Sequence, residues 1–503
     1  MKVSRISAIT LIVLLLIVGI CSSQNTGEYP REGVQHDSEA RFEEEYIEQI
    51  KQLVKGLEYS DKVAEDFVQM VSGWKDAQGR PVLTLWKQRL NQARQDYKQG
   101  RISKEQLAKA EENITRELSQ RIQKEINYNE KFFDLIDVIK NKQAGCLGYS
   151  QLVCLLGNSI GLSVEAIDVE KPMTGAFPAE PAHTASIVSL TDGKMMMVDL
   201  VPAGFVSKPF IIKKEFAKVG NYWELKDEDN PLGIHRRIQI FDRNGLIAAI
   251  YNERGVIYGK SGQYQKAISY LAKAIELNPK YALAYYNRGT ANHKLGQYTQ
   301  AISDYTKAIE LDPKYAVAYN NRGVAYYDLG QYTQAISDYT RAIELNSEFA
   351  EAYYNRGVVY YDLGQHPKAI SDYTRAIELN PKYAEAYNNR GIVYYDLGQY
   401  PKAISDYTKA IELNPKYAVA YNNRGNAYYG LGQYPKAISD YTRVIELNPE
   451  FALAYYNRGL AYAFLGKFEE AKKDLFKAVE LNPALKTHVK KASDHFKLNL
   501  KLE

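Results

Sequence analysis

Residues 316–349 read "AVAYNNRGVAYYDLGQYTQAISDYTRAIELNSEF", and this stretch decides the fold of the C-terminal half of the chain. Its Arg-Gly pair returns every 34 residues from residue 246 onward. The recurring arginines are Arg254, Arg288, Arg322, Arg356, Arg390, Arg424 and Arg458. A repeat of this length predicts a stack of supersecondary units that bury a shared core only when they lie side by side.

The repeat resembles the tetratricopeptide repeat, a pair of helices. In the unit 316–349 the small and aromatic residues fall at the packing positions of that motif: Tyr319, Gly323, Tyr326, Ala335, Tyr339 and Ala342. The resemblance implies seven repeats of 34 residues over 248–485, an all-α solenoid. Residues 486–503 are then expected to form the polar C-terminal capping helix that such arrays need.

Two sets of positions in the repeat carry predictions. Arginine at position 7 and aspartate at position 23 predict an ion-pair ladder between the two helices of each repeat. By resemblance to the family, positions 2, 5, 9, 12 and 13 of the first helix line the inner groove. Here positions 12, 13 and 5 supply Tyr327, Tyr361, Tyr395 and Tyr429, then Asp328, Asp362 and Asp396, then Asn320, Asn388 and Asn422.

These groove residues allow two interpretations. The functional one is an aromatic and acidic trough that binds an extended protein segment or peptide. The other is that near-identical repeats reflect duplication and that the tyrosines pack between repeats. Position 5 has no lysine, so the basic clamp of chaperone-binding repeats is absent and a chaperone tail is not the expected partner.

The N-terminal half lacks the 34-residue repeat and has a different pattern of predicted elements. Residues 38–128 read as helices with polar breaks, and Ser103-Lys-Glu-Gln106 has the form of a capping box. Residues 129–245 contain the helix-like "AGCLGYSQLVCLLGNSIGL", followed by the alternating runs "SVEAIDVE", "HTASIVSL" and "KMMMVDLV". A helix followed by an antiparallel meander predicts an α+β domain.

Cys146 and Cys154 lie in that helical run, eight residues apart. On one helix this spacing is roughly 12 Å, too far for a disulfide. Cys154 lies among leucines and valine and is expected to be a small core residue. Cys146 follows Gly145 at the expected helix start, where backbone N–H groups favour a thiolate. His183 opens one strand and Asp199 closes the next, which gives a thiol nucleophile a base and an orienting carboxylate.

"GCLGYSQLVCLLGNSIGLSVEAIDV" and "HTASIVSLTDGKMMMVDL" are similar to the core of the transglutaminase-like superfamily, with papain-like architecture, over residues 143–210. The resemblance implies that Cys146 is the nucleophile, His183 the base and Asp199 its partner. We assign the oxyanion hole to the Cys146 N–H and the Gln143 amide. The implied activity is attack on amide bonds of a protein or peptide. The alternatives are a non-catalytic envelope scaffold with a degenerate domain, and a cell-wall amidase.

Composition narrows the remaining function classes. The 64 basic and 60 acidic residues nearly balance, which argues against nucleic-acid binding through bulk charge. Phosphate-binding glycine loops, HExxH, CxxC and dinucleotide fingerprints are absent from the sequence, so no cofactor or metal is expected.

The N-terminus suggests export. Residues 1–23 combine Lys2 and Arg5 with an apolar run and read as a signal peptide, followed by a polar leader over 24–37. The stretch "LIVGIC" also resembles a bacterial lipoprotein signal, in which Cys21 would carry a lipid and attach the chain to a membrane. Either route predicts a periplasmic, cell-envelope or secreted protein. The whole chain is thus expected to be multidomain, an α+β transglutaminase-like domain followed by the all-α solenoid.

Overall fold

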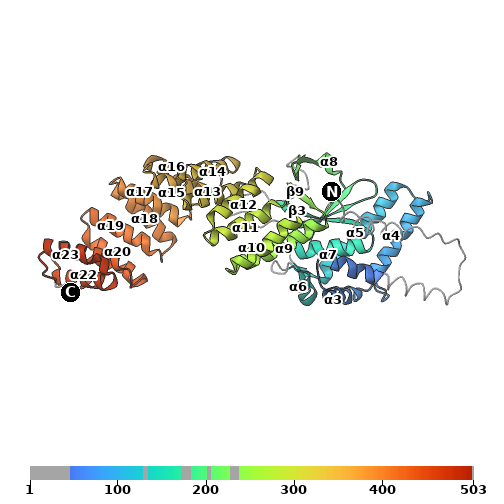
Figure 1. Ribbon diagram of the computed structural model, residues 1–503, viewed down its shortest axis with the longest axis horizontal. Coiled ribbons are helices and arrows are strands. Elements are labelled where there is room, and N and C mark those ends of the chain that lie inside the picture. Colours follow the sequence, from blue (N-terminus) through green and yellow to red (C-terminus); the bar gives the residue numbers. More distant parts are fainter. Residues whose placement is uncertain are drawn as a thin grey trace, which may run out of the picture. The chain divides into compact units, whose positions relative to one another are not determined.

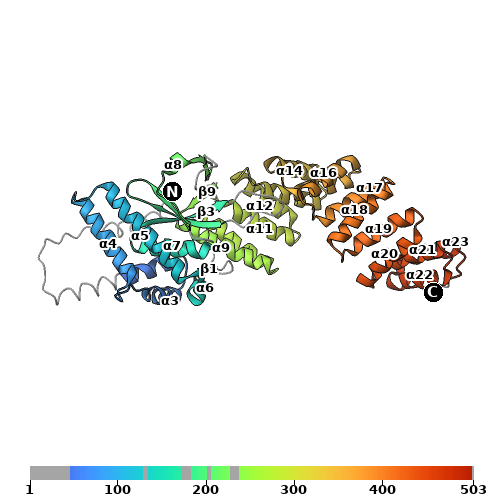
Figure 2. The same cartoon turned by 180° about the vertical axis from the view of Figure 1, so that it is seen from behind.

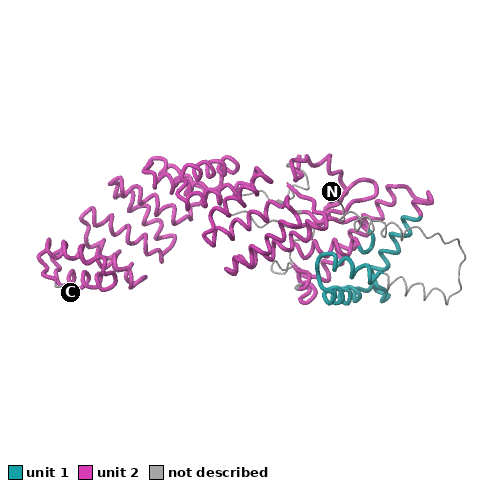
Figure 3. The backbone as a smooth tube through the Cα atoms, in the orientation of Figure 1, with its two compact units in different colours: residues 1–95, 159–161 teal, residues 96–158, 162–503 magenta. Residues whose placement is uncertain are grey.

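The computed structural model describes residues 46–128, 134–144, 146–170, 183–200, 205–226 and 237–500. The chain divides into two compact units (Figure 3). Unit 1 comprises residues 1–95 and 159–161, and unit 2 comprises residues 96–158 and 162–503. The predicted signal peptide 1–23, the leader 24–37 and Cys21 lie outside the described residues.

Helices dominate up to residue 125, as the sequence predicts. Residues 46–55 are helical, and α3 (Asp61–Ser72), α4 (Val82–Lys98) and α5 (Lys104–Glu125) follow. The capping box at the start of α5 is confirmed: Gln106 N–H donates to Ser103 Oγ at 3.2 Å, and Ser103 N–H donates to Gln106 Oε1 at 2.7 Å. These bonds satisfy backbone donors that the first turn of a helix leaves without partners.

An antiparallel sheet forms the centre of the α+β region. Among the described residues it has seven strands in the order β6-β5-β4-β3-β9-β8-β7. Their bounds are β3 (Ser163–Glu170), β4 (His183–Ser189), β5 (Met195–Asp199), β6 (Phe205–Val206), β7 (Phe216–Val219), β8 (Tyr222–Leu225) and β9 (Arg237–Phe241). The sequence predicts β3, β4 and β5. The other four strands were missed, because they are short and lack a sustained apolar alternation.

Smaller elements surround this sheet. They are β1 (Asn127–Tyr128), α6 (Leu135–Asn141), β2 (Gln143–Ala144), α7 (Cys146–Ser159) and α8 (Ile212–Glu215), with β1 and β2 paired in parallel. One face of the sheet holds a core that includes Ile167, Ile187 and Met197. Helix α7 lies on the other face, where the Sγ of Cys154 is 3.9 Å from the Oγ of Ser186.

The C-terminal region is a succession of antiparallel helix pairs, which Figures 1 and 2 show from opposite sides. The first helices are α9 (Arg243–Lys260), α11 (Ala282–Lys294), α13 (Ala316–Asp328), α15 (Ala350–Asp362), α17 (Ala384–Asp396), α19 (Ala418–Gly430) and α21 (Ala452–Phe464). The second helices are α10 (Tyr264–Leu277), α12 (Tyr298–Leu311), α14 (Tyr332–Leu345), α16 (His366–Leu379), α18 (Tyr400–Leu413), α20 (Tyr434–Leu447) and α22 (Phe468–Leu481). The prediction of seven helix pairs is confirmed.

Glycine at position 8 lets the two helices of a repeat approach closely. A Cβ placed on Gly391 would lie 2.7 Å from Cε1 of Tyr407, a distance that no real side chain tolerates. Tyr407 is 1% exposed, and Ala403 and Ala410 beside it are fully buried. In the five middle repeats the core is therefore a buried tyrosine packed against small residues, whereas Leu271 and Leu475 take its place in the first and last repeats.

The predicted C-terminal capping helix is shorter than expected. After the turn η2 (Pro483–Leu485), helix α23 covers Lys486–His495 and packs through Val489 and Ala492. Lys497 and Asn499 then have positive φ angles of 57° and 51°, which end the helix. This reversal of the chain places Leu498 in the core, where it is 2% exposed. The chain therefore ends its helix at His495 and buries Leu498 instead of extending the helix toward residue 503.

Candidate functional site

The sheet brings the three predicted triad positions to one end. Helix α7 begins at Cys146, β4 begins at His183 and β5 ends at Asp199. Ser186 of β4 pairs with Val198 of β5, so the end of β5 lies beside the beginning of β4. The side chains of Cys146 and His183 lie outside the described residues.

The direction of α7 follows from its contacts with the sheet. Near its end, Asn158 Nδ2 donates to the Val164 carbonyl at 2.9 Å, and Val164 pairs with Val188 in the second half of β4. Cys154 faces Ser186 nearer the middle of β4. The next eight residues back along α7 cover roughly 12 Å, and three residues back along β4 cover roughly 10 Å. The beginnings of α7 and β4 therefore lie at the same end of the sheet.

The surroundings of the other residues singled out in this domain are clear. Asp199 is 3% exposed, whereas Gln143, in β2, is half-buried. Tyr149 is buried and donates its hydroxyl to the Ile126 carbonyl at 2.7 Å. Burial raises the pKa of the Cys154 thiol to about 12. The prediction that Cys154 is a small core residue is confirmed.

The Arg–Asp ladder of the repeats is confirmed from the second repeat onward. Arg390 of α17 donates from Nε and Nη2 to the two carboxylate oxygens of Asp406 in α18, both at 2.8 Å. Its Nη1 also donates to Thr374 Oγ1 of the preceding repeat, at 2.9 Å. The same pairs are Arg288–Asp304, Arg322–Asp338, Arg356–Asp372, Arg424–Asp440 and Arg458–Asp474. One such arginine thus joins the two helices of its own repeat to each other and to the second helix of the preceding repeat.

A second ladder joins positions 12 and 13 of successive first helices. Tyr327 donates its hydroxyl to Asp362 at 2.7 Å, and Tyr361 donates to Asp396 at 2.8 Å. The tyrosines are half-buried, whereas the aspartates remain exposed. Burial, followed by the bond to Asp396, raises the pKa of Tyr361 to about 12. The tyrosines therefore pack between repeats and also present a polar edge.

The ladder has two irregular ends. His293 stands at position 12 of its repeat, and its Nε2 lies 2.7 Å from Asp328. Sequence reasoning missed His293, although counting 34 residues back from Tyr327 finds it. At the other end, Gly430 stands at position 13, so the sixth repeat supplies no aspartate at that position for Tyr395. Phe464 stands at position 13 of the seventh repeat, and Tyr429 contacts its ring edge-on with the centroids 5.6 Å apart.

The asparagines at position 5 lie elsewhere. Asn320 and Asn388 are 1% and 2% exposed and accept bonds from Asn355 and Asn423 of the next repeat, both at 3.1 Å. Asn422 accepts a longer bond from Asn457, at 3.5 Å. The prediction that Asn320 and Asn388 line an accessible groove is therefore corrected. Their amides are used to join neighbouring repeats.

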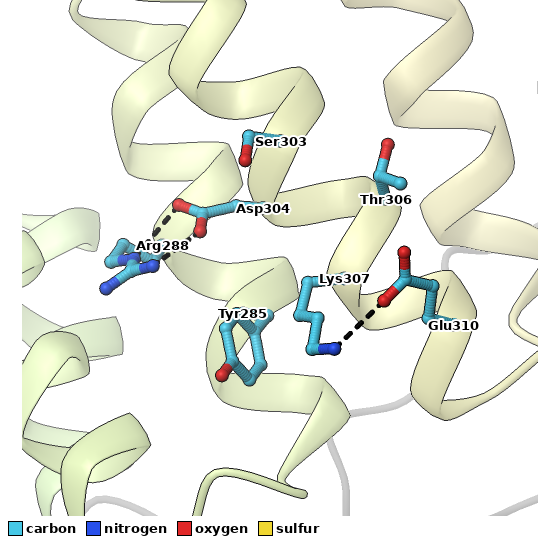
Figure 4. A pocket seen from close by; sticks show the side chains of 7 residues that line it. All are labelled: Tyr285, Arg288, Ser303, Asp304, Thr306, Lys307 and Glu310. Atoms are coloured by element: carbon cyan, nitrogen blue, oxygen red, sulfur yellow. Dashed lines mark hydrogen bonds and ion pairs between the residues drawn. The ribbon is translucent and has the colours of Figure 1, made fainter.

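A pocket of about 370 Å³ opens between α11 and α12 (Figure 4). It is lined by Tyr285, Arg288, Ser303, Asp304, Thr306, Lys307 and Glu310. Both cations of the pocket are paired, Arg288 with Asp304 and Lys307 with Glu310. Thr306 accepts a bond from Arg322. The charged side chains that line this pocket are therefore paired with one another.

Within the described ranges, no helix combines the length and apolar character needed to cross a bilayer. Nor do these residues include a group of three or more His, Cys, Asp or Glu side chains arranged to hold a metal ion.

Three family models match the chain in its C-terminal part. A model described as TPR repeat matches residues 291–330, 325–364 and 359–398. Two models described as tetratricopeptide repeat match residues 248–281, 384–417, 418–451 and 452–485, and residues 270–303. Together they cover 248–485, somewhat less than half of the 503 residues. The transglutaminase-like resemblance lies outside these ranges.

Solved structures with a likeness to the chain include YrrB, described as a TPR protein with an unusual peptide-binding site. It is 29% identical, the match covers 37% of this chain and 95% of that one, and the TM-score is 0.32. MamA is 32% identical over 32% of this chain and 94% of its own, with a TM-score of 0.31. A tetratricopeptide repeat protein from Parabacteroides merdae ATCC 43184 is 25% identical over 50% and 98%, with a TM-score of 0.38. None of the curated proteins matches the chain.

The stacked helix pairs define residues 248–485 as an α-helical solenoid. The period, the packing residues and the matching family models identify these residues as tetratricopeptide repeats. Repeats of this kind indicate a protein–protein interaction role.

Proposed function

We propose that the repeat array binds an extended polypeptide segment on the surface formed by its first helices. The observation that carries this proposal is the continuity of that surface. Successive first helices contact one another from α13 to α21, and the Tyr327–Asp362 and Tyr361–Asp396 bonds join them. Repeats stacked in this way present one long surface rather than separate pockets.

Selection from a random library of 15-residue peptides against the full chain tests this proposal. The selected peptides should bind the double variant Tyr361→Ala/Tyr395→Ala at least tenfold more weakly, because both rings lie on the surface in question. The control is Lys409→Ala, on the second helix of a repeat, where the side chain is 47% exposed. The proposal fails if no peptide is enriched, or if the double variant binds as tightly as the control.

As a second candidate, we propose that the sheet domain carries a Cys146–His183–Asp199 thiol centre. It is supported by the arrival of α7, β4 and β5 at one end of the sheet. It is further supported by the position of Cys146 as the first residue of a 14-residue helix. Odd-numbered positions of β4 and β5, including 183 and 199, belong to the face of the sheet opposite to Ser186 and α7. A thiol centre therefore requires Cys146 to reach His183 and Asp199 past the end of the strands rather than across one face.

The proposed chemistry is acyl transfer through a thioester. The Cys146 thiolate attacks an amide carbonyl carbon, the C–N bond breaks, and the leaving amine takes a proton from His183. Water then hydrolyses the thioester and restores the thiol, or a second amine takes the acyl group. The Cys146 N–H and the Gln143 amide would hold the oxyanion.

Iodoacetamide labelling as a function of pH, read by mass spectrometry on the intact chain, tests the thiol centre. Cys146 should label with an apparent pKa well below about 8.5, the value for a free cysteine. His183→Ala should raise that pKa, and Cys154 serves as an unreactive internal control. If Cys146 labels like a free thiol or ignores the loss of His183, the domain is the non-catalytic scaffold of the alternative.

Export stays part of the proposal. Residues 1–23 would direct the chain out of the cytoplasm, with Cys21 as the site of lipid attachment in the second route. The mass of the N-terminal peptide, from cells that express the full chain, distinguishes the cases. Cleavage near Ser23, a lipid-modified Cys21 and an uncleaved Met1 give three different masses, and the third would overturn the proposed processing.

A further inference from the structure

The surface of the first helices changes character along the array. Positions 2 and 13 are eleven residues apart, about three helical turns, so they lie on one side of each first helix. In α13, α15 and α17 these positions hold five carboxylates that are all exposed: Asp328, Glu351, Asp362, Glu385 and Asp396. We name these five residues the acidic segment.

In the last two repeats the same positions are apolar. Val419 and Leu453 take the place of the glutamates, and Phe464 takes the place of the aspartates. These three side chains are 45%, 47% and 46% exposed, among the most exposed large apolar residues of the described chain. We name them the apolar segment. Phe464 stacks on Tyr434 with ring centroids 5.0 Å apart and an interplanar angle of 7°, so its ring is held in place.

Exposed apolar side chains at repeat-equivalent positions mark an interaction surface better than scattered ones do. The charge of this surface indicates which kind of partner it would bind. From α13 to α21, positions 2, 9, 12 and 13 contain no lysine or arginine, although the whole chain has a net charge of +4. The surface is therefore locally negative on a chain of net positive charge, so a basic partner would be attracted to this face rather than to the chain as a whole.

We propose that the partner is an extended polypeptide in which a Lys- and Arg-rich stretch adjoins bulky apolar residues. The basic stretch lies along the acidic segment, and the apolar residues lie against Leu453 and Phe464. This inference rests on the proposed peptide-binding function and names the chemistry of the peptide. Tyr327 and Tyr361 each occupy one oxygen of an aspartate, so they orient the carboxylates while leaving the other oxygen for a cation.

Three synthetic probes on the full chain test the inference. One joins a block of alternating lysine and arginine to a Leu-Phe block, in either order, and the other two contain a single block each. The joined probe should bind at least tenfold more tightly than either block alone. Its affinity should fall as salt increases, because screening weakens contacts between exposed charges.

Two variants separate the two segments. Asp362→Asn/Glu385→Gln/Asp396→Asn keeps side-chain shape but removes three of the five charges, and should weaken the joined probe at least tenfold and reduce the salt dependence. Leu453→Ser/Phe464→Ser should weaken it by a similar factor while the salt dependence stays. The matched control is Glu412→Gln/Glu446→Gln, carboxylates of the second helices that are both 57% exposed. Its binding should equal that of the parent chain.

The possible outcomes distinguish the basic and apolar character of the peptide from peptide binding itself. If the control variant loses as much affinity as the charge variant, the attraction is non-specific and the inference falls. If random-library peptides bind the first-helix surface without a basic stretch beside apolar residues, the inference falls while the peptide-binding function stands. If neither library peptides nor the joined probe binds, both fall. Self-association of the chain in place of probe binding would also overturn the inference.

Discussion

At the scale of single residues, the two cysteines of α7 occupy different positions on one helix. Cys154 lies in the middle of the helix against the sheet and is 7% exposed. Cys146 begins the same helix, where backbone N–H groups have no helical partners. The sequence alone predicts this difference, because the leucines and valine around Cys154 mark a buried position whereas Gly145 precedes a helix start.

The buried thiol of Cys154 should make the free energy of unfolding depend on pH. Its pKa is raised by burial to about 12, whereas an unfolded cysteine ionises near 8.5. Between these values the native state holds a proton that the unfolded state has lost, so the free energy of unfolding falls as pH rises. Relative to Cys154→Ala, the parent chain should lose about 2 kcal/mol of stability between pH 7 and pH 10. Urea unfolding of both proteins at each pH measures the change, and an unchanged difference would contradict the buried thiol.

At the scale of elements, the repeats from the second to the sixth are each held by a tyrosine core and by an Arg–Asp pair. Arg390 and Asp406 are 16% and 8% exposed, so their pairing is shielded from water. Removal of one partner leaves an uncompensated charge, which costs about 3–5 kcal/mol in buried pairs. Exposed ion pairs on the second helices, such as Lys409–Glu412, contribute much less.

Asp406→Ala should therefore destabilise the array by about 3 kcal/mol or more. Lys409→Ala, on the same helix, should change the free energy of unfolding by less than about 0.5 kcal/mol. Guanidinium unfolding followed by circular dichroism compares the two variants with the parent chain. Equal effects would mean that the ladder does not hold the helices together.

The repeats were predictable from sequence at the level of elements, because a 34-residue period fixes which residues share a position. The Arg–Asp pairs followed from that period. The Tyr–Asp bonds did not, because they join different repeats and depend on the rotation between successive helix pairs. The burial of Asn320 and Asn388 was missed for the same reason. In the sheet domain, the short strands β6 to β9 pair over two to five residues, which gives no periodic signal.

At the scale of the whole molecule, two departures from the repeat pattern mark where the array meets the residues before it within unit 2. Position 31 is asparagine in the other six repeats but Asp312 in the second. Arg237 of β9 donates to both oxygens of Asp312 at 2.6 Å, and the Asp312 side chain is 2% exposed. Likewise position 23 of the first repeat is Tyr270, and Arg254 pairs with Asp134 instead.

Asp312→Asn should uncouple the sheet from the array. Asparagine at this position bonds the backbone two residues on in the sister repeats, as Asn380 does to Lys382 N–H at 3.1 Å, so the local turn survives. Only the ion pair with Arg237 is lost, and because Arg237 keeps its ion pair with Glu224 the expected cost is about 1.5–3 kcal/mol. Calorimetry should show a lower melting temperature and a broader or split transition. Lys314→Ala, which removes the 60%-exposed partner of Glu224, should leave the transition in place.

Binding of an extended polypeptide by the first helices is the proposed function of the whole array. Hydrogen–deuterium exchange of the full chain, with and without a saturating selected peptide, tests this binding. We expect slower exchange in α13, α15, α17, α19 and α21, with unchanged exchange in the sheet and in the second helices. Protection confined to the sheet, or spread equally over first and second helices, would contradict it.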